Sequence, residues 1–415
     1  MPLFKSPRIP TWEGYHYERD DTSTNNEEQS TYKYGRRAPI EEIPPKAFKR
    51  APFTKPPFTH DDLRKAIPPH CFQRSIPHSF LYLFYDVAAV FTLYHVATDF
   101  IPLLPIPLRY LAWLVYWVAQ GCVLVGISEI AHGCGHHSFS DHEWLDDVVG
   151  LLLFSPLLIP YFSFQFSHGR HHANMGSIGR EEALATKRRD ALSQGGERIF
   201  QWLRKTPFRL IIIVGGLLFG VQLSLTVGFG GRQYNQISSL LNPWSPIFSR
   251  KQRLQVVISD VFLAAALYTY YQIGATQGWE WFLCVYGGPY VVHNALAVMM
   301  VSLSHMHPAL PRYDADEWDW LRGSLSTVDR DWGVLNHTFH HMPDLHVVHH
   351  LFPKMPHYHL QEATHYVRPI LGEYYQRDTT SIYKALFREV QCLAFVQKDN
   401  DVEHGGVFWF AIDKS

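Results

Sequence analysis

Three histidine clusters, each beside an apolar stretch, constrain the fold of this 415-residue chain most strongly. They are His132-x-x-x-His136-His137, His168-x-x-His171-His172 and His346-x-x-His349-His350. A helix places residues three and four apart on one face, so each cluster can present two or three nitrogens to one point. Neutral imidazole binds iron, zinc and copper. Because no cluster suffices alone, we expect a membrane fold that gathers all three around a dinuclear metal site.

Six apolar segments are candidates for crossing a membrane, since a crossing helix needs about 20 mostly apolar residues. They are residues 79–101, 110–131, 148–166, 208–227, 256–273 and 281–303. If the three clusters bind one metal pair, they must lie on the same side of the bilayer. An even number of crossings must therefore separate each cluster from the next, and two of the six segments cannot cross.

Prolines and glycines indicate which two segments fail to cross. Residues 148–166 contain Pro156 and Pro160, and residues 208–227 contain three glycines that weaken a helix. The sequence therefore predicts an all-α membrane protein with four transmembrane helices in two hairpins, further interfacial helices, and a cytosolic cap that carries the histidines. The positive-inside tendency supports a cytosolic cap. It is carried by Lys187, Arg188, Arg189, Arg198, Arg204 and Lys205.

The rest of the chain divides by composition. Residues 1–59 are polar and are expected to be a disordered tail without a signal peptide; residues 60–390 are expected to form the membrane-embedded domain, and residues 391–415 a C-terminal tail. The net charge of −1 gives no reason to expect a nucleic-acid partner. The five cysteines show no C-x-x-C spacing, which predicts neither a disulfide framework nor a thiolate zinc site.

Further histidines could complete the site. His305 ends the last apolar segment at the membrane boundary and is a candidate tenth ligand. His341 either orients a ligand or belongs to a solvated histidine-rich loop. Two irons with all-nitrogen ligands and open positions suit O₂ activation. At a membrane surface such chemistry can attack an unactivated C–H bond, so the expected substrate is a lipid acyl chain.

The motifs around these histidines resemble those of the plant microsomal oleate (Δ12) fatty acid desaturases, over about residues 55–410. The matching stretches include KPPFTHDDLRKAIPPHCFQRSIP, FSDHEWLDDVVG, HPALPRYDADEWDWLRG, TVDRDWGVLN and PILGEYYQRD. The resemblance implies an endoplasmic reticulum enzyme that uses O₂ and two iron ions to desaturate oleoyl chains on a phospholipid. It also implies electrons from a separate cytochrome b5 and its reductase, and possible homo- or hetero-oligomers with other desaturases. The implied iron ligands are the nine clustered histidines together with His305.

Several residues depart from the usual family pattern. Gly133 replaces the acidic residue of the first box, whereas Glu129 occupies a position that is usually apolar. Because residues 129 and 133 are i, i+4 neighbours on a helix, we hypothesise that Glu129 takes over the orientation of an imidazole N–H. Gly169 replaces an arginine in the second box, and Ser304 replaces a glutamine. Asn174, which still matches the family, is a further candidate for supporting the ligands.

Three functions therefore remain open. The first is an acyl-lipid Δ12 desaturase, and the second is a divergent relative that acts as a hydroxylase, acetylenase, conjugase or desaturase at another position. The third is a non-catalytic histidine-rich membrane protein, such as a metal transporter or a scaffold. Transporters place ionisable ligands deep within their spans, whereas these histidines follow the apolar segments. The sequence thus favours an enzyme.

Overall fold

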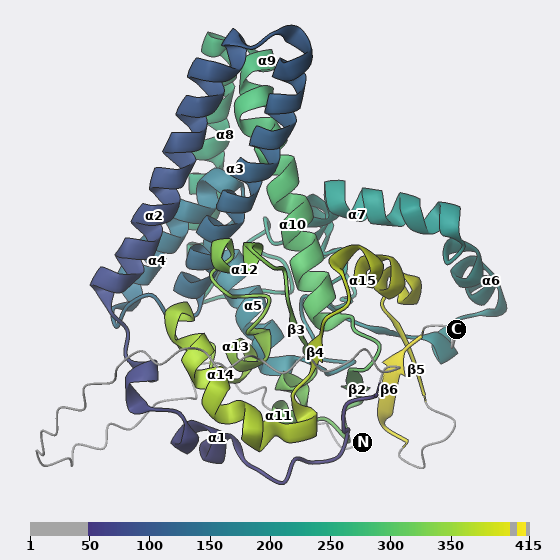
Figure 1. The fold of residues 1–415 in the computed structure, drawn as a ribbon. Helices are drawn as coiled ribbons and strands as arrows, with labels where there is room; N and C mark the ends of the chain where they lie inside the picture. Colours follow the sequence, from purple (N-terminus) through teal and green to yellow (C-terminus); the bar gives the residue numbers. More distant parts are fainter. Residues whose placement is uncertain (1–48, 399–404, 412–415) are drawn as a thin grey trace, which may run out of the picture. The chain divides into compact units, whose positions relative to one another are not determined.

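The structure, a computed structural model, describes residues 49–398 and 405–411. Helices predominate among these residues and a few short strands join them, which agrees with an all-α membrane class (Figure 1). The tail predicted for residues 1–59 lies outside the described residues as far as residue 48. The tail predicted for residues 391–415 is described over 391–398 and 405–411.

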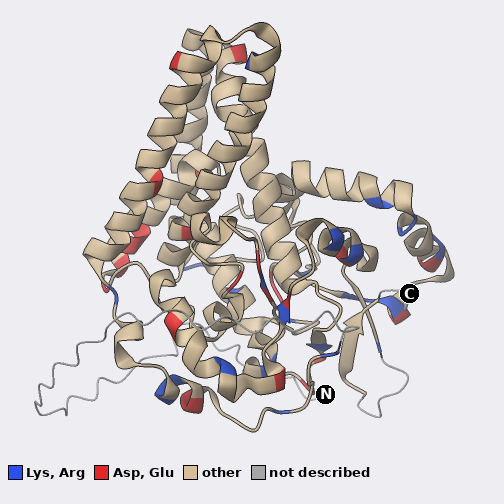
Figure 2. Cartoon of the chain, viewed as in Figure 1, with Lys and Arg blue, Asp and Glu red and all other residues tan. Residues whose placement is uncertain are grey.

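Five helices of the described chain are long and apolar enough to cross a membrane. They are α2 (Ile76–His95) continued by η3 (Val96–Phe100) and η4 (Ile101–Leu103), α3 (Ile106–Gly135), α7 (Thr206–Val227), α8 (Arg253–Gln277), and α9 (Trp279–Phe282) continued by η7 (Leu283–Gly287) and α10 (Gly288–His305). Figure 1 shows α2, α3, α8 and α10 running alongside one another, whereas α7 runs across them. Charged residues are sparse along these four helices (Figure 2), as burial in lipid requires.

The length of α3 carries the first histidine cluster beyond the lipid. Its 30 residues span about 45 Å, whereas the hydrocarbon core of a bilayer is about 30 Å thick. The last turn of α3 contains His132, and His136 follows directly as the C-cap residue. The metal-binding candidates of the first cluster therefore sit at the end of a helix that is longer than the membrane is thick.

The segment predicted not to cross because of its prolines is bent sharply. It comprises α4 (Glu143–Phe154), η5 (Ser155–Leu157) and α5 (Tyr161–Asn174), and the two halves meet at 104°. The break contains Leu158 in the left-handed conformation, with φ of 56°, and Pro160 as the N-cap of α5. Proline disfavours a helical conformation in the residue before it, so the chain turns here instead of continuing straight.

The expectation that glycines would weaken residues 208–227 as a helix is wrong. α7 is one continuous helix of 22 residues, and it passes the length and composition criterion for a span. A Cβ added at Gly215 or Gly216 would meet no atom within 4 Å, so these glycines face open space. Each glycine costs about 1 kcal/mol of helix propensity. The backbone hydrogen bonds of the many apolar residues of α7 outweigh this cost, so the helix stays continuous.

Short strands and helices make up much of the chain outside the long helices. One sheet has the order β1-β5-β6-β2 and a second pairs β3 with β4 in parallel. The strands are β1 (Lys187–Arg188), β2 (Pro311–Tyr313), β3 (Asp329–Arg330), β4 (Arg377–Asp378), β5 (Phe395–Lys398) and β6 (Val407–Phe410). The remaining helices are α1 (His60–Ala66), η2 (Pro69–Phe72), η6 (Arg189–Ala191), α6 (Gln194–Leu203), α11 (Trp320–Ser324), α12 (Leu335–Thr338), α13 (His346–Leu351), α14 (His357–Leu371), η8 (Gly372–Tyr374), α15 (Ile382–Glu389) and η9 (Val390–Cys392).

An apolar cluster holds the third histidine cluster in place. Val347 and Val348 of α13 are fully buried, and they pack with Leu63 of α1 and with Leu360 and Val367 of α14. With the valines directed into this core, the histidines at 346, 349 and 350 face the ends of α3, α5 and α10. Packing of a six-residue helix thus sets the direction of three ligand candidates.

Candidate metal centre

Five histidines from three helices and one helix end converge on a first point. All of their ligand nitrogens lie within 4.8 Å of one another. Nε2 of His132 lies 2.7 Å from Nε2 of His168 and 3.0 Å from Nε2 of His136. Nε2 of His172 lies 3.0 Å from Nε2 of His168. The first group comprises His132, His136, His168, His172 and His349.

A second group of histidines lies beside the first. His171, His305 and His350 have ligand nitrogens within 4.8 Å of one another. His346 joins them, because its Nε2 lies 3.0 Å from Nε2 of His305. The rings of His172 and His350 stack with centroids 4.0 Å apart, so the two groups touch. The arrangement offers two adjacent metal positions, as the sequence predicts.

Three of the imidazoles form hydrogen bonds through Nδ1, the ring nitrogen that points away from the histidine groups. Their Nε2 atoms remain available to bind a metal. Nδ1 of His132 donates to Glu129 at 2.9 Å, and Nδ1 of His171 donates to Glu181 at 2.7 Å. Nδ1 of His346 donates to the Met342 carbonyl at 3.2 Å. A neutral imidazole that donates from Nδ1 has its lone pair on Nε2, which is the tautomer that a metal ligand needs.

Several buried ring nitrogens in the described part of the chain have no hydrogen-bond partner, and a metal cation would satisfy them. Among the described residues, Nε2 of His349 and both ring nitrogens of His350 are buried and have no hydrogen-bond partner. Burying such a group without a partner costs about 1–3 kcal/mol. A cation held by several imidazole lone pairs removes that cost, and an all-imidazole set suits iron.

Burial keeps these imidazoles in the uncharged form. It lowers the pKa of His136, His168 and His172 well below the ordinary value, and the neighbouring histidines lower it further. Burial likewise lowers the pKa of His346 to about 3. These four imidazoles are therefore neutral at physiological pH, as metal coordination requires.

Glu181 supports the second group, a role that the histidine spacing does not predict. The residue is 3% exposed, and Oε1 also accepts the backbone N–H groups of Ala183 and Leu184. Burial alone would raise the pKa of Glu181, but the interaction with His171 and the hydrogen bonds from the two amides outweigh burial and lower it. The ionised carboxylate can then hold the His171 ring. The signal was present as the acidic pair Glu181-Glu182, ten residues after the histidine.

Three residues predicted for the site are not members of either group. The close histidine groups found among the described residues do not include His137, whose backbone φ is 55°. The Asn174 side chain donates to the Arg170 carbonyl within its own helix at 2.9 Å. His341 contacts Asp344 at 3.0 Å and His337 at 3.2 Å. Glu129, in contrast, lies where the sequence predicts it, against His132.

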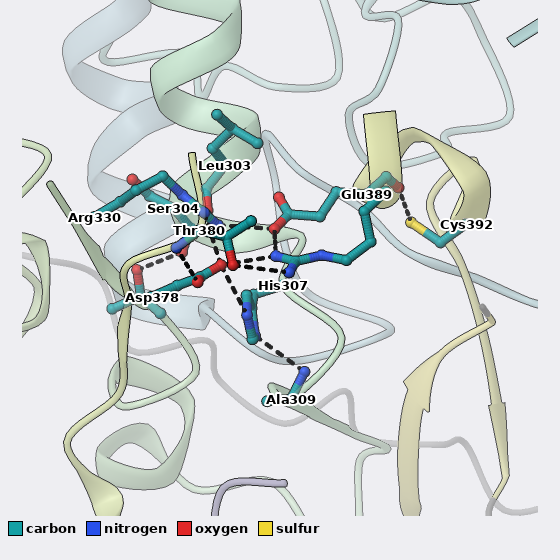
Figure 3. A network of polar contacts seen from close by, with 11 residues as sticks. Leu303, Ser304, His307, Ala309, Arg330, Asp378, Thr380, Glu389 and Cys392 are labelled. Carbon is teal, nitrogen blue, oxygen red and sulfur yellow. Dashed lines mark hydrogen bonds and ion pairs between the residues drawn. The ribbon is translucent and has the colours of Figure 1, made fainter. Parts of the chain in front are cut away.

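A buried charge network (Figure 3) holds the end of α10, the helix whose last residue is His305. The last carbonyls of a helix lack partners within the helix. Here Arg330 donates to the Leu303 carbonyl at 3.1 Å, Thr327 donates to the Ser304 carbonyl at 2.9 Å, and Arg312 donates to the His305 carbonyl. These donors fix the last turn of α10 and hence the position of His305.

Two carboxylates neutralise Arg330 within the same network (Figure 3). Its guanidinium donates to Asp378 and to Glu389, each at 2.7 Å. Burial would raise the pKa of Asp378, but hydrogen bonding to His307 and the charge of Arg330 hold it well below the ordinary value. Burial raises the pKa of Glu389 to about 7 despite the two arginines beside it. The carboxylates come from β4 and α15, so the segment after the third cluster also helps to fix His305.

Comparison with known proteins gives the family. Residues 111–381 match the model of the fatty acid desaturase family. The Delta(12) fatty acid desaturase FAD2 of Calendula officinalis is 49% identical over 88% of this chain and 94% of its own length. The oleoyl-12-hydroxylase FAH12 of Ricinus communis is 48% identical over 87% and 92%. The omega-6 fatty acid desaturase, endoplasmic reticulum isozyme 2, of Glycine max is 47% identical over 87% and 94%. This chain belongs to the fatty acid desaturase family.

Proposed function

We propose that this protein is an acyl-lipid desaturase that inserts the Δ12 double bond into oleoyl chains of a phospholipid, giving linoleoyl chains. The observation that carries the proposal is the pair of adjacent, largely buried histidine groups in a chain 49% identical to a Delta(12) fatty acid desaturase. The same observation speaks against a metal transporter, because the histidines gather at helix ends instead of along a membrane path.

The proposed topology has four crossings in two hairpins. The first hairpin joins α2 to α3, and the second joins α8 to the helix from α9 to α10. The 104° bend between α4 and α5 and the crosswise direction of α7 support an interfacial position for those segments (Figure 1). His132 and His305, which lie at the ends of α3 and α10, then fall on one side. We assign that side to the cytosol and the membrane to the endoplasmic reticulum, as the Glycine max relative's name suggests.

Two iron ions would occupy the two histidine groups, where they would supply the O₂ activation that removes hydrogens from an acyl chain. The first iron would be held by His132, His136, His168, His172 and His349, and the second by His171, His305, His346 and His350. Glu129 and Glu181 orient one imidazole of each group through its Nδ1–H. Burial of the ligands excludes water from the reacting centre. Electrons would come from a separate cytochrome b5 and its reductase.

A second candidate reaction is hydroxylation of the same acyl chain. It is favoured by a specific observation: the Ricinus communis oleoyl-12-hydroxylase is 48% identical to this chain, almost as similar as the desaturase from Calendula officinalis. Overall identity therefore does not separate the two reactions. Conjugated or acetylenic products belong to the same group of alternatives. The departures next to ligand candidates in the sequence are Gly133, Gly169 and Ser304.

Expression in a yeast strain that contains oleate but no linoleate tests the proposal. Gas chromatography with mass spectrometry of the fatty acid methyl esters should reveal a linoleate peak that is absent from the His349→Ala variant. A hydroxylated, conjugated or acetylenic ester would instead establish the second candidate. If neither type of product forms although the protein accumulates with bound iron, the Δ12 proposal is wrong.

A further inference from the structure

A third group of potential metal ligands is distinct from the two histidine groups. It contains His70 and Cys71 from η2 together with His359 and Glu362 from α14. One ligand atom from each of the four residues lies within 4.8 Å of every other. Nε2 of His70 is already 3.0 Å from Oε2 of Glu362. The chain thus assembles two imidazoles, one thiol and one carboxylate at a single place.

The spacing of the four ligand atoms is close to that of a tetrahedral zinc site. Zinc bonds of about 2.0–2.3 Å to nitrogen, oxygen and sulfur separate neighbouring ligand atoms by about 3.3–3.7 Å. Side-chain movements of about 1 Å would bring the observed atoms to that spacing. His359 and Glu362 are three residues apart on α14, so their side chains project from one helix face. The rings of His70 and His359 pack edge to face, with their centroids 5.7 Å apart.

The surroundings suit a site that is closed on one side and open on the other. Cys71 is fully buried and belongs to the apolar cluster that also contains Leu360 and Ala363 of α14. His70 and Glu362 are about half exposed, which provides a path for an ion to enter. Burial, and then the charge and hydrogen bond of Glu362, raise the pKa of the Cys71 thiol to about 12. Without a cation this thiol stays protonated, whereas a bound zinc ion deprotonates a coordinating thiol.

We propose that His70, Cys71, His359 and Glu362 form a structural zinc site that fastens η2 to α14. The expectation that the chain holds no thiolate zinc site rested on the absence of C-x-x-C, but here a single thiolate is completed by residues about 290 positions away. The consequence reaches the iron ligands, because α14 packs against α13, which carries His346, His349 and His350. Zinc bound here would stiffen the platform under the third histidine cluster.

Metal analysis of the iron-loaded enzyme tests the site. We expect the wild-type protein to bind one Zn²⁺ per chain in addition to its iron, and the His359→Asn variant to bind that ion at least about tenfold more weakly. Iron content should be unchanged in this variant. The matched control is His365→Asn, since His365 is exposed on the same helix and lies outside the group; it should bind zinc like the wild type.

Cobalt distinguishes this site from the iron ligands, which are all histidines. Co²⁺ added to the iron-loaded enzyme should give a thiolate-to-cobalt charge-transfer band that is missing in Cys71→Ser and weakened in His359→Asn. Because Cys71→Ser removes a buried group, its folding is checked by size-exclusion chromatography, and His359→Asn provides the result if the serine variant does not fold. Equal zinc binding by the wild type and His359→Asn, or a cobalt spectrum without the thiolate band, would overturn the proposal.

Discussion

Replacing Glu181 by glutamine should loosen the metal held by the second histidine group. The Glu181 carboxylate accepts the Nδ1–H of His171 at 2.7 Å, and two backbone amides fix the same oxygen. These contacts hold the His171 ring with Nε2 directed toward His305 and His350. Glutamine keeps the size of the side chain but removes its charge, so the effect isolates the electrostatic part of this support.

The size of the effect follows from the geometry. A hydrogen bond to a charged group contributes about 1.5–3 kcal/mol, about 1 kcal/mol more than a neutral one. Oε2 of Glu181 is buried and has no hydrogen-bond partner among the described residues. The glutamine NH₂ would take that position and would remain unsatisfied, which costs a further 1–3 kcal/mol or so. The difference of about 1 kcal/mol in the hydrogen bond to His171 corresponds to roughly fivefold weaker iron binding, since about 1.4 kcal/mol is a factor of ten. The unsatisfied NH₂ lowers the stability of the iron-free and the iron-bound protein alike, so it should lower the thermal midpoint.

Glu182 provides a matched control for the adjacent position. It is 4% exposed, compared with 3% for Glu181, and its carboxylate accepts the Tyr234 hydroxyl at 2.8 and 2.9 Å. Glu182→Gln therefore removes an equally buried carboxylate that contacts no iron ligand candidate. Each variant is titrated with an iron chelator, and the iron remaining per chain is measured together with the thermal midpoint. Equal iron retention by Glu181→Gln, Glu182→Gln and the wild type would refute the role of Glu181.

Three further variants test other parts of the structure. Glu129→Gln should lower iron affinity by about 10–100-fold through His132, as measured by the same titration, and wild-type retention would exclude that role. Gly169→Arg should raise the free energy of unfolding by about 0.5–1 kcal/mol and leave the product unchanged, because a Cβ added there meets no atom within 4 Å and arginine favours a helix more than glycine does; a thermal midpoint below wild type would contradict this. Burial raises the pKa of Asp329 from 3.8 to about 7, so the folded protein holds a proton that the unfolded chain releases, and stability falls as pH rises from about 4 to 7. In Asp329→Asn the thermal midpoint should depend less on pH over that range. An unchanged pH dependence would show that another group titrates.

Local spacing makes the histidine groups predictable, whereas contacts between distant segments determine which residues hold the imidazole rings. The i, i+3 and i+4 pattern identifies histidines that share a helix face without knowledge of the fold, and Glu129 could be placed in the same way. Glu181 contacts His171 only because the chain turns after α5. The spacing of apolar and polar residues does not predict that turn. His341 was named because it lies among other histidines, but its partner is Asp344 in its own loop.

The division of the histidines between two metal positions follows from the helix repeat. Successive residues of a helix are about 100° apart, so residues i and i+4 differ by about 40°, whereas i+3 lies about 100° from i+4. In the second cluster the i, i+4 pair joins the first group and the i+3 residue joins the second; in the third cluster the assignment is reversed. The members are His168 and His172 against His171, and His346 and His350 against His349. In this fold neither H-x-x-H-H cluster directs all its nitrogens to one group, and the two clusters divide their histidines between the two groups in a complementary way. The spacing itself thus favours a dinuclear centre over a single metal, on grounds independent of any relative.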